Sequence, residues 1–175
     1  DNVIDLAKYP LEAQQRESHS KRRLGLGVTG MANMIEYVLG GPCYGSGHYV
    51  ELQDRVLELL TLTSYKASVE LAKEKGSFPL YDERYRHGEF ISCLPEELRK
   101  DICWNGIRNS HLTSIAPAGT ISMTAGNVSS GIEPVFHHTT RRKLYGADGE
   151  EHEVQLNDYG YEKGIQGKVA EDCTI

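Results

Sequence analysis

The segment SIAPAGTIS, residues 114–122, has the residue types of an anion-binding site. It is typical of a short apolar strand, a turn and the beginning of a helix. Several backbone N–H groups at a helix N-terminus lack partners, and the peptide dipoles add partial positive charge there. A phosphate satisfies both, because Ala118 and Gly119 leave its approach open while Thr120 and Ser122 offer hydroxyl groups. An ordinary capped turn has the same composition, so the residues alone leave both interpretations open.

A second candidate is GLGVTG at residues 25–30, which matches the GxGxxG pattern of dinucleotide-binding folds. That interpretation requires an apolar strand before the first glycine and an acidic residue about 20 positions further on. The preceding residues, HSKRR at 19–23, are too polar for a buried parallel strand. Glu51 and Asp54 lie at about the right distance, but within an expected long helix. We therefore interpret the glycines as positions where a strand packs closely against the next helix.

Patterns for metal binding and for nucleophilic catalysis are weak. His137 and His138 are adjacent in an expected strand, where successive side chains point to opposite faces and cannot share an ion. No GxSxG nucleophile elbow occurs, and the segment 114–122 lacks the lysine of a nucleotide-hydrolysing P-loop. The four cysteines, none of them in a CxxC pair, are Cys43, Cys93, Cys103 and Cys173. The sequence therefore assigns no catalytic residue and no metal ligand, and free structural thiols are expected.

The elements that must position these residues alternate between helix and strand. Helices are expected over residues 3–7, 31–39, 47–75, 95–104 and 119–124. Strands are expected over residues 22–28, 112–115, 134–144 and 153–156, with a tight turn at Asp148 and Gly149. The longest helix has apolar residues near the helical period, Ser46 as a candidate N-cap, and Gly76 where a left-handed C-terminal residue belongs. This alternation indicates an α/β fold.

Composition narrows the class of protein. The chain has 175 residues, 39% of them apolar, and a net charge of −6. That acidic balance disfavours a nucleic-acid surface, and the basic clusters at residues 21–23 and 141–143 are interpreted as solvated strand ends. No apolar run approaches the roughly 20 residues of a membrane span. Isolated cysteines are typical of a reducing compartment, so a cytoplasmic location is expected.

At the segment 114–122 the sequence resembles the large catalytic subunit of ribonucleotide reductases. The similarity is carried by IAPAGTIS at residues 115–122 and AGNVSSGIEP at 125–134. It extends upstream, in the family's order, through DNVID at 1–5, YP at 9–10, RRLGLGVTG at 22–30 and LAKEKGSFP at 71–79. The form SSGIEPVF at 129–136 is most similar to the adenosylcobalamin-dependent class II enzymes.

The resemblance implies a portion, from the second half, of a ten-stranded α/β barrel that is incomplete as an isolated chain. Residues 1–144 would form the partial barrel domain, and residues 145–175 a hairpin and C-terminal extension of it. The family reduces ribonucleotides to 2′-deoxyribonucleotides for DNA synthesis. A cysteine thiyl radical abstracts the 3′-hydrogen, and a cysteine pair supplies electrons.

The resemblance also implies residue roles and partners. Substrate phosphate binding falls on Pro117, Ala118, Gly119, Thr120, Ile121 and Ser122. The family more often has Thr where this chain has Ala118, so a side-chain contact would be missing while the backbone contacts remain. The implied partners are a ribonucleotide substrate, the remainder of the same polypeptide, a thioredoxin-type reductant and, through unpaired strand edges, a second copy. Adenosylcobalamin is implied for the full-length enzyme and is not expected to bind this portion.

The family's radical cysteine lies in an Asn-x-Cys-x-Glu motif, which does not occur in this sequence. In the family's order that motif and the reducing cysteines precede Asp1, so the chain is expected to be an excised fragment that is catalytically inert by itself. A non-catalytic nucleotide- or phosphate-binding α/β domain is the alternative. An Asn-x-Cys-x-Glu motif encoded upstream would favour the first interpretation, and a native start codon at Asp1 the second.

Overall fold

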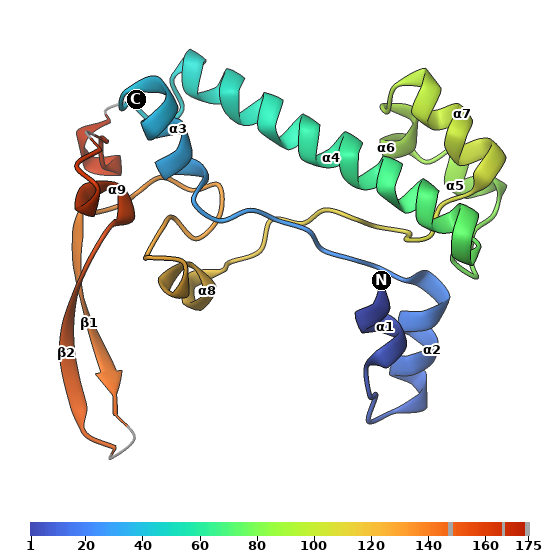
Figure 1. Cartoon of the computed structure of the whole chain (residues 1–175), viewed down its shortest axis with the longest axis horizontal. Coiled ribbons are helices and arrows are strands. Elements are labelled where there is room, and N and C mark those ends of the chain that lie inside the picture. The colour runs from blue at the N-terminus through green and yellow to red at the C-terminus, as the bar shows by residue number, and fades with distance from the viewer. Residues whose placement is uncertain (147–148, 166, 174–175) are drawn as a thin grey trace. The chain divides into compact units, whose positions relative to one another are not determined.

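The computed structural model describes residues 1–146, 149–165 and 167–173, and Figure 1 shows its elements. The chain divides into two compact units. Unit 1 comprises residues 1–26 and 57–114, and unit 2 comprises residues 27–56 and 115–175. The long helix α4 (Gly47–Lys75) contributes its first part to unit 2 and the rest to unit 1. Each unit is described by itself.

Helix α4 has the bounds that its apolar spacing predicts. Gly76 ends it in the left-handed region at φ 79°, where its N–H donates to the Ala72 carbonyl over 2.8 Å, as expected. Ser46 takes the predicted N-cap position, but its side chain makes no capping hydrogen bond among the described residues. The Ser46 hydroxyl is buried without a hydrogen-bond partner among the described residues, and it is the Ser46 carbonyl that accepts from the Val50 N–H. In the described part of the chain, no helix is both long and apolar enough to cross a membrane.

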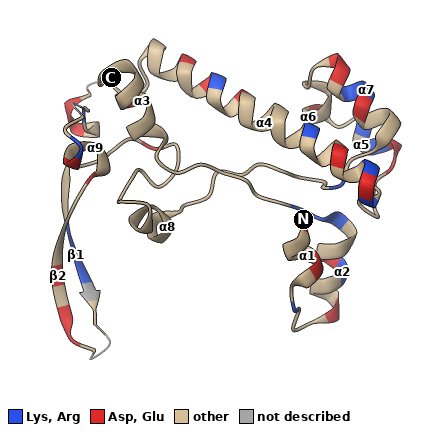
Figure 2. Ribbon diagram, in the orientation of Figure 1, with Lys and Arg blue, Asp and Glu red and all other residues tan. Residues whose placement is uncertain are grey.

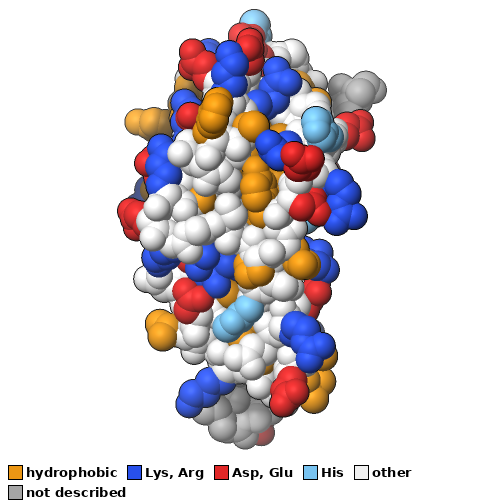
Figure 3. All heavy atoms as spheres, turned by 90° about the vertical axis from the view of Figure 1, so that its right-hand side faces the viewer, with side chains coloured by type: hydrophobic (Ala, Val, Ile, Leu, Met, Phe, Trp, Pro, Cys, Tyr) orange, Lys and Arg blue, Asp and Glu red, His pale blue; other side chains and the backbone are white. Residues whose placement is uncertain are grey.

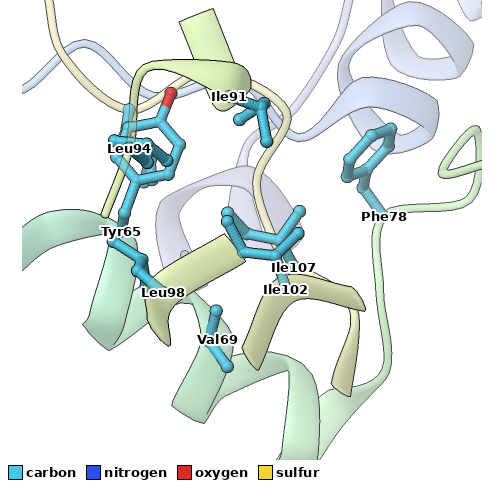
Figure 4. Close-up of a cluster of buried hydrophobic side chains, with 9 residues drawn as sticks. Tyr65, Val69, Phe78, Ile91, Leu94, Leu98, Ile102 and Ile107 are labelled. Atoms are coloured by element: carbon cyan, nitrogen blue, oxygen red, sulfur yellow. The ribbon is translucent and has the colours of Figure 1, made fainter. Parts of the chain in front are cut away.

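Unit 1 is built around one hydrophobic cluster, drawn in Figure 4. Besides α4, its described helices are α1 (Asn2–Leu6), α2 (Glu12–Lys21), α5 (Glu83–Arg86), α6 (Glu89–Ser92) and α7 (Glu96–Asn105). Val69 from α4 and Ile102 from α7 belong to the cluster, as does Ile107, which follows α7. Ile102 and Ile107 are fully buried, and the Tyr81 hydroxyl donates to the Ile102 carbonyl over 2.8 Å. This cluster holds α7 and the loop after it on α4.

The two strands expected at residues 22–28 and 112–115 form one parallel bridge, between Leu26 and Thr113, and the Leu24 N–H donates to the His111 carbonyl beside it over 2.9 Å. The Leu26 N–H donates to the Leu112 carbonyl, and the Ser114 N–H donates to the Leu26 carbonyl, both over 2.8 Å. The prediction of full strands is therefore wrong for the described residues, although the pairing is parallel. A barrel strand is completed by neighbours on both sides, and each of these segments pairs with one neighbour here.

The basic cluster at residues 21–23 is not uniformly solvated, and this corrects the sequence interpretation for Arg22. Arg22 is 4% exposed, because its guanidinium contacts the carboxylates of Asp1 and Asp5 at 2.9 and 2.8 Å. Asp1, whose side chain is 3% exposed, also accepts from Arg108 over 3.2 Å. Arg23 is exposed and pairs with Glu17. Because Asp1 lies 21 positions before Arg22, the residues next to Arg22 in the sequence do not indicate that it is buried.

Figure 3 shows the side of the molecule on which α5, α6 and α7 lie in Figure 1. Acidic and basic side chains alternate over this face, with scattered hydrophobic side chains between them. This interspersed pattern is typical of an ordinary solvated surface.

Unit 2 contains α3 (Met31–Leu39), α8 (Gly119–Thr124), α9 (Tyr159–Glu162), a 3₁₀ turn η1 (Ala170–Asp172) and a two-stranded antiparallel sheet. Strand β1 (Thr139–Tyr145) pairs with β2 (Glu151–Asn157) from Thr139 opposite Asn157 to Tyr145 opposite Glu151. Figure 2 shows basic residues on β1 and acidic residues on β2. Across the pair, the Lys143 ammonium contacts the Glu151 carboxylate at 2.5 Å. The first strand was expected from residue 134 but begins at Thr139.

The tight turn expected at Asp148 and Gly149 involves Asp148, which lies outside the described residues. The exposed basic residues at 141–143 lie on β1, in agreement with their interpretation as a solvated strand. A domain boundary at residue 144 stays a prediction.

Candidate functional site

The loop predicted to bind an anion leads into α8, as the sequence indicates. Residues 115–117 are exposed, and Ala118 takes the N-cap position of α8 without a side-chain hydrogen bond. Among the described residues, none accepts a hydrogen bond from the N–H groups of Gly119, Thr120 or Ile121. A methyl group placed on Gly119 would meet no atom within 4 Å. The start of α8 therefore presents free donors to an open space.

The side chains of the predicted loop differ in what they can offer a ligand. Thr120 is exposed, so its hydroxyl is accessible, and Ile121 is 64% exposed. Ser122 is buried, and its hydroxyl donates to the Gly119 carbonyl over 2.9 Å. Ser122 thus holds the first turn of α8 together, and the donors available to an anion are the backbone N–H groups and the Thr120 hydroxyl.

The GxGxxG segment leads to the start of α3, also in unit 2, and the N–H groups there already have acceptors. The N–H of Gly30 donates to the Ser129 carbonyl over 2.7 Å, and that of Met31 to the Gly131 carbonyl over 3.3 Å. The N–H of Ala32 donates to the Ser129 hydroxyl over 3.3 Å. The chain's own acceptors occupy the place that a dinucleotide phosphate would need, in agreement with the rejection of that motif.

The glycines of this segment allow close approach, but to a loop rather than to the next helix. A β-carbon on Gly30, whose φ is +73°, would meet the Val128 side chain at 3.3 Å. In unit 1, a β-carbon on Gly25 would meet the Ser114 hydroxyl oxygen at 2.8 Å. Close packing is therefore confirmed as the role of these two glycines, with the segments around residues 114 and 128 as the partners.

A buried polar clamp fixes the segment that follows α8, and sequence reasoning missed it. The Asn33 side chain on α3 accepts from the Ser129 N–H over 2.8 Å. Its amide donates to both carboxylate oxygens of Asp158 over 2.9 and 3.0 Å. Asp158 in turn caps α9 by accepting from the Gly160 N–H over 2.7 Å. The sequence signal that could have revealed the clamp is the polar residue Asn33 on the apolar face of α3. A buried amide requires hydrogen-bond partners, so its position predicts polar groups nearby.

Charged side chains lie near α8 as well. The Arg142 guanidinium on β1 lies 3.3 Å from the Met123 sulfur, which places a positive charge alongside α8. A hollow of about 110 Å³ next to the helix is lined in part by Ser122, Ser130, Glu133 and Arg142. Arg142 and Glu133 place opposite charges at this hollow, whose lining includes Ser122 but not the donor residues Gly119 and Thr120.

The two adjacent histidines diverge, although not within a strand as expected. Both precede β1, and His138 stacks on Tyr161 with ring centroids 5.2 Å apart, whereas His137 lies 3.5 Å from Glu171. Among the residues that the structure describes, no group of three or more His, Cys, Asp or Glu side chains could hold a metal ion.

Glu36, on the same helix as Asn33, is a buried acid beneath the segment after α9. Its carboxyl lies against Gly167 and near Gly160. Burial, and to a smaller extent the negative charge of Asp158, raises the pKa of Glu36 from 4.5 to about 7. The folded state therefore favours the neutral acid over the carboxylate.

Replacement of Glu36 by glutamine is expected to stabilise the protein at pH 8 but not at pH 4. The carboxyl is neutral in both folded and unfolded states below pH 4.5, so stability is not reduced there. As pH rises from 4.5 to 7 the unfolded state ionises first, and stability falls by up to about 3 kcal/mol. Urea unfolding across this pH range measures the difference. The exposed Glu162→Gln is the control, and equal pH profiles for both variants and the parent would contradict the assignment.

Comparison with known proteins identifies the family. The profile described as "Ribonucleotide reductase, barrel domain" matches residues 1–167. The chain belongs to this family. A "Vitamin B12-dependent ribonucleoside-diphosphate reductase" from Mycobacterium tuberculosis (strain CDC 1551 / Oshkosh) is 34% identical to this barrel domain over 146 residues, which is 83% of the chain. A protein of the same description from Thermoplasma acidophilum is 38% identical over 136 residues, 78% of the chain.

A "Ribonucleoside-diphosphate reductase subunit alpha" from Treponema pallidum is similar as well, at 28% identity over 143 residues, 78% of the chain. The reductase barrel segment matches only 16 to 18% of the length of these three relatives. The family resemblance inferred from the sequence is thus confirmed, and the matched region includes the loop before α8.

Proposed function

We propose that this chain is the part of a ribonucleotide reductase catalytic subunit that holds the phosphates of the substrate. The binding loop comprises Pro117, Ala118, Gly119, Thr120, Ile121 and Ser122. The observation that carries the proposal is the contrast between the starts of α3 and α8, both of which lie in unit 2. The first N–H groups of α3 donate to the chain's own acceptors, whereas those of Gly119, Thr120 and Ile121 have no acceptor among the described residues.

The complete enzyme is proposed to reduce ribonucleoside diphosphates to 2′-deoxyribonucleoside diphosphates for DNA synthesis. The diphosphate is preferred over the triphosphate because the similar relatives are named for it. In this proposal the parallel pair at Leu26 and Thr113 belongs to two neighbouring strands in the second half of a ten-stranded α/β barrel. Residues 1–144 belong to the barrel, and residues 145–175 complete the hairpin and extend it.

The role of this chain's residues is to bind and orient. Backbone donors and the Thr120 hydroxyl hold the phosphates, and the Asn33 clamp fixes the segment behind them. The remainder of the polypeptide supplies the radical cysteine and the reducing pair, which a thioredoxin-type protein regenerates. Association with a second copy through unpaired strand edges is part of the same proposal.

Adenosylcobalamin is proposed as the cofactor of the complete enzyme, where it would supply the radical, because two of the similar relatives are named for vitamin B12. The described residues do not fit it. The cavity in unit 2 lined by Asn33, Tyr37, Tyr159 and Lys163 measures about 600 Å³, the size of a drug-like ligand. A corrinoid carrying adenosine is larger than that. No residue of this chain is assigned to the cofactor.

The proposal assigns phosphate binding to this chain and the radical chemistry to the remainder of the polypeptide. It can be tested by assaying the chain by itself and the longer polypeptide that contains it. Supplied with adenosylcobalamin, a dithiol and a ribonucleoside diphosphate, the chain alone is expected to form no deoxyribonucleotide, and the longer polypeptide is expected to form it. Chromatography of the nucleotide products measures both. Product from the chain alone would refute the assignment of the radical chemistry to the remainder, and no product from the longer polypeptide would refute the reductase activity.

A further inference from the structure

The cavity of about 600 Å³ in unit 2 is walled by three segments that are distant in the sequence. Met34 and Tyr37 line it from α3, and Val128 lines it from the segment after α8. Tyr159 and Lys163 line it from α9 and from the residue that follows α9. The sequence gives no motif for this cavity, because its walls meet only in the folded chain.

Hydrogen bonds join the three walls, so the cavity does not require a ligand to form. Helices α3 and α9 lie side by side (Figure 1), and the Asn33 amide joins them through Asp158. The Tyr159 N–H donates to the Asn127 carbonyl over 3.3 Å, and the Asn127 amide donates to the Asn157 carbonyl over 2.8 Å. These two bonds tie the start of α9 to the segment after α8. A largely preformed cavity of this size is typical of sites for small organic ligands.

Two tyrosine rings and several apolar side chains line the cavity. A β-carbon on Gly126, whose φ is +87°, would meet the Tyr159 ring at 3.1 Å, so the glycine allows this ring to lie against the backbone. Tyr37 is 74% exposed, which leaves its ring accessible to a ligand. Met34 and Val128 add apolar surface between α3 and the segment after α8. Aromatic rings pack well on one another, so this lining favours a flat aromatic ligand.

Lys163 gives the cavity a positive charge. No Asp or Glu is among its described lining residues, and the Lys163 ammonium lies 5.6 Å from the centre of the Tyr159 ring rather than in an ion pair with a described carboxylate. The nearby Asp158 is 6% exposed, and its carboxylate already accepts from Asn33 and from the first N–H groups of α9. An acidic group on a ligand would therefore meet a cation beside apolar surface, where charges attract more strongly than in bulk water.

We propose that this cavity binds a flat aromatic acid, with its rings against Tyr37 and Tyr159 and its carboxylate at the Lys163 ammonium. An aliphatic acid of similar size retains the contact with Lys163 but loses the packing of ring on ring. A neutral aromatic compound retains that packing but loses the contact with the cation. The combination of both features defines the ligand class.

A ribonucleoside diphosphate does not match this lining. Its ribose would lie against Met34 and Val128, which offer no hydrogen bond, and the Asn33 side chain is already bonded to other groups of the chain. Gly119 and Thr120, which belong to the proposed phosphate loop, do not line the cavity. The inference therefore does not rest on the proposed function, and either can fail without the other.

The test is calorimetric titration of the full chain with naphthalene-2-carboxylate, a flat aromatic acid, at neutral pH. Saturable binding of one molecule per chain is expected. Naphthalene-2-carboxamide, the neutral analogue, should bind up to about fivefold more weakly, as expected for the loss of one partly exposed ion pair. Octanoate, the aliphatic acid, should also bind more weakly. A lack of saturable binding, or an affinity for either comparison compound equal to that for naphthalene-2-carboxylate, would overturn the proposal.

Two variants with matched controls locate the ligand. Lys163→Gln is expected to abolish the preference for the acid over the amide, and Tyr37→Ala is expected to weaken binding of both compounds severalfold. Both side chains are exposed, so the urea unfolding midpoint should not change. The controls Lys168→Gln and Tyr145→Ala change exposed residues outside the lining and should leave both affinities unaltered. A retained preference in Lys163→Gln, or unchanged affinities in Tyr37→Ala, would place the ligand elsewhere and overturn the proposal.

Discussion

Replacement of Ala118 by aspartate is expected to weaken binding of a ribonucleoside diphosphate to the complete reductase at least about a hundredfold without destabilising the fold. Ala118 is the N-cap of α8, and an aspartate there accepts hydrogen bonds from the N–H groups two and three positions on. Those are the free donors of Thr120 and Ile121. Each hydrogen bond to a charged group contributes about 1.5–3 kcal/mol, so losing two of them, with a carboxylate facing the phosphate, exceeds about 3 kcal/mol.

The same substitution separates binding from folding. A new N-cap is expected to raise the free energy of unfolding by about 1 kcal/mol, which urea titration measures. Ala118→Asn provides the matched neutral control, because it competes for the same donors without repelling the phosphate and should lose less affinity than aspartate. Unchanged affinity in Ala118→Asp, measured by calorimetry, would place the phosphates elsewhere.

Replacement of Arg22 by methionine is expected to destabilise the protein by about 3–5 kcal/mol, the largest effect on folding that we predict. The Arg22 guanidinium and the Asp1 carboxylate are both buried and in contact at 2.9 Å. Removing one member of a buried pair leaves the other charge without full compensation. Arg108 still contacts Asp1, but its guanidinium also donates to the carbonyls of Lys75 and Gly76.

The adjacent residue supplies the control for this prediction. Arg23 pairs with Glu17 at 3.0 Å, but both side chains are about half exposed, so Arg23→Met should cost no more than about 1 kcal/mol. Chemical denaturation of both variants, followed by circular dichroism, measures the two losses. Equal losses for Arg22→Met and Arg23→Met would show that the buried contact contributes nothing beyond a surface pair.

The helices that could be predicted from the sequence are those with a local signal at both ends and along one face. Helix α3 has the expected bounds because its apolar residues recur at the helical period, and Gly40 ends it in a left-handed conformation. Helix α2 was interpreted only as a polar stretch, since it has no buried residue and hence no apolar stripe to detect. Local patterns thus identified helices with an apolar stripe, and missed α2 and the four-residue helix α9, which is too short to show one.

The strands and the buried polar groups depend on partners that a local pattern does not contain. Residues 22–28 and 112–115 have strand-like sequences, yet a ladder forms only as far as a neighbouring backbone extends beside it. Arg22 looked like a surface residue because its partner Asp1 is 21 positions away. For the same reason the Asn33–Asp158 clamp became visible only in the structure.

At the candidate site, the sequence predicted the position of the loop and of the helix start, but not the hydrogen bonds that the side chains make. The helix start at Gly119 and the open approach were expected from small residues between two elements. The inward turn of the Ser122 hydroxyl was not expected, because a serine in a first helical turn can either face a ligand or bond to a carbonyl of its own turn. Composition alone does not decide between those two alternatives.

The most direct test of the phosphate loop is a titration of the isotopically labelled chain with a ribonucleoside diphosphate, followed by amide nuclear magnetic resonance. The loop assignment predicts saturable shifts of the Gly119, Thr120 and Ile121 amides, and none when the ribonucleoside without phosphates is added. The amides of Gly30, Met31 and Ala32, which already donate to Ser129 and Gly131, should not move. Shifts at α3 with none at α8, or equal shifts with the phosphate-free nucleoside, would contradict it.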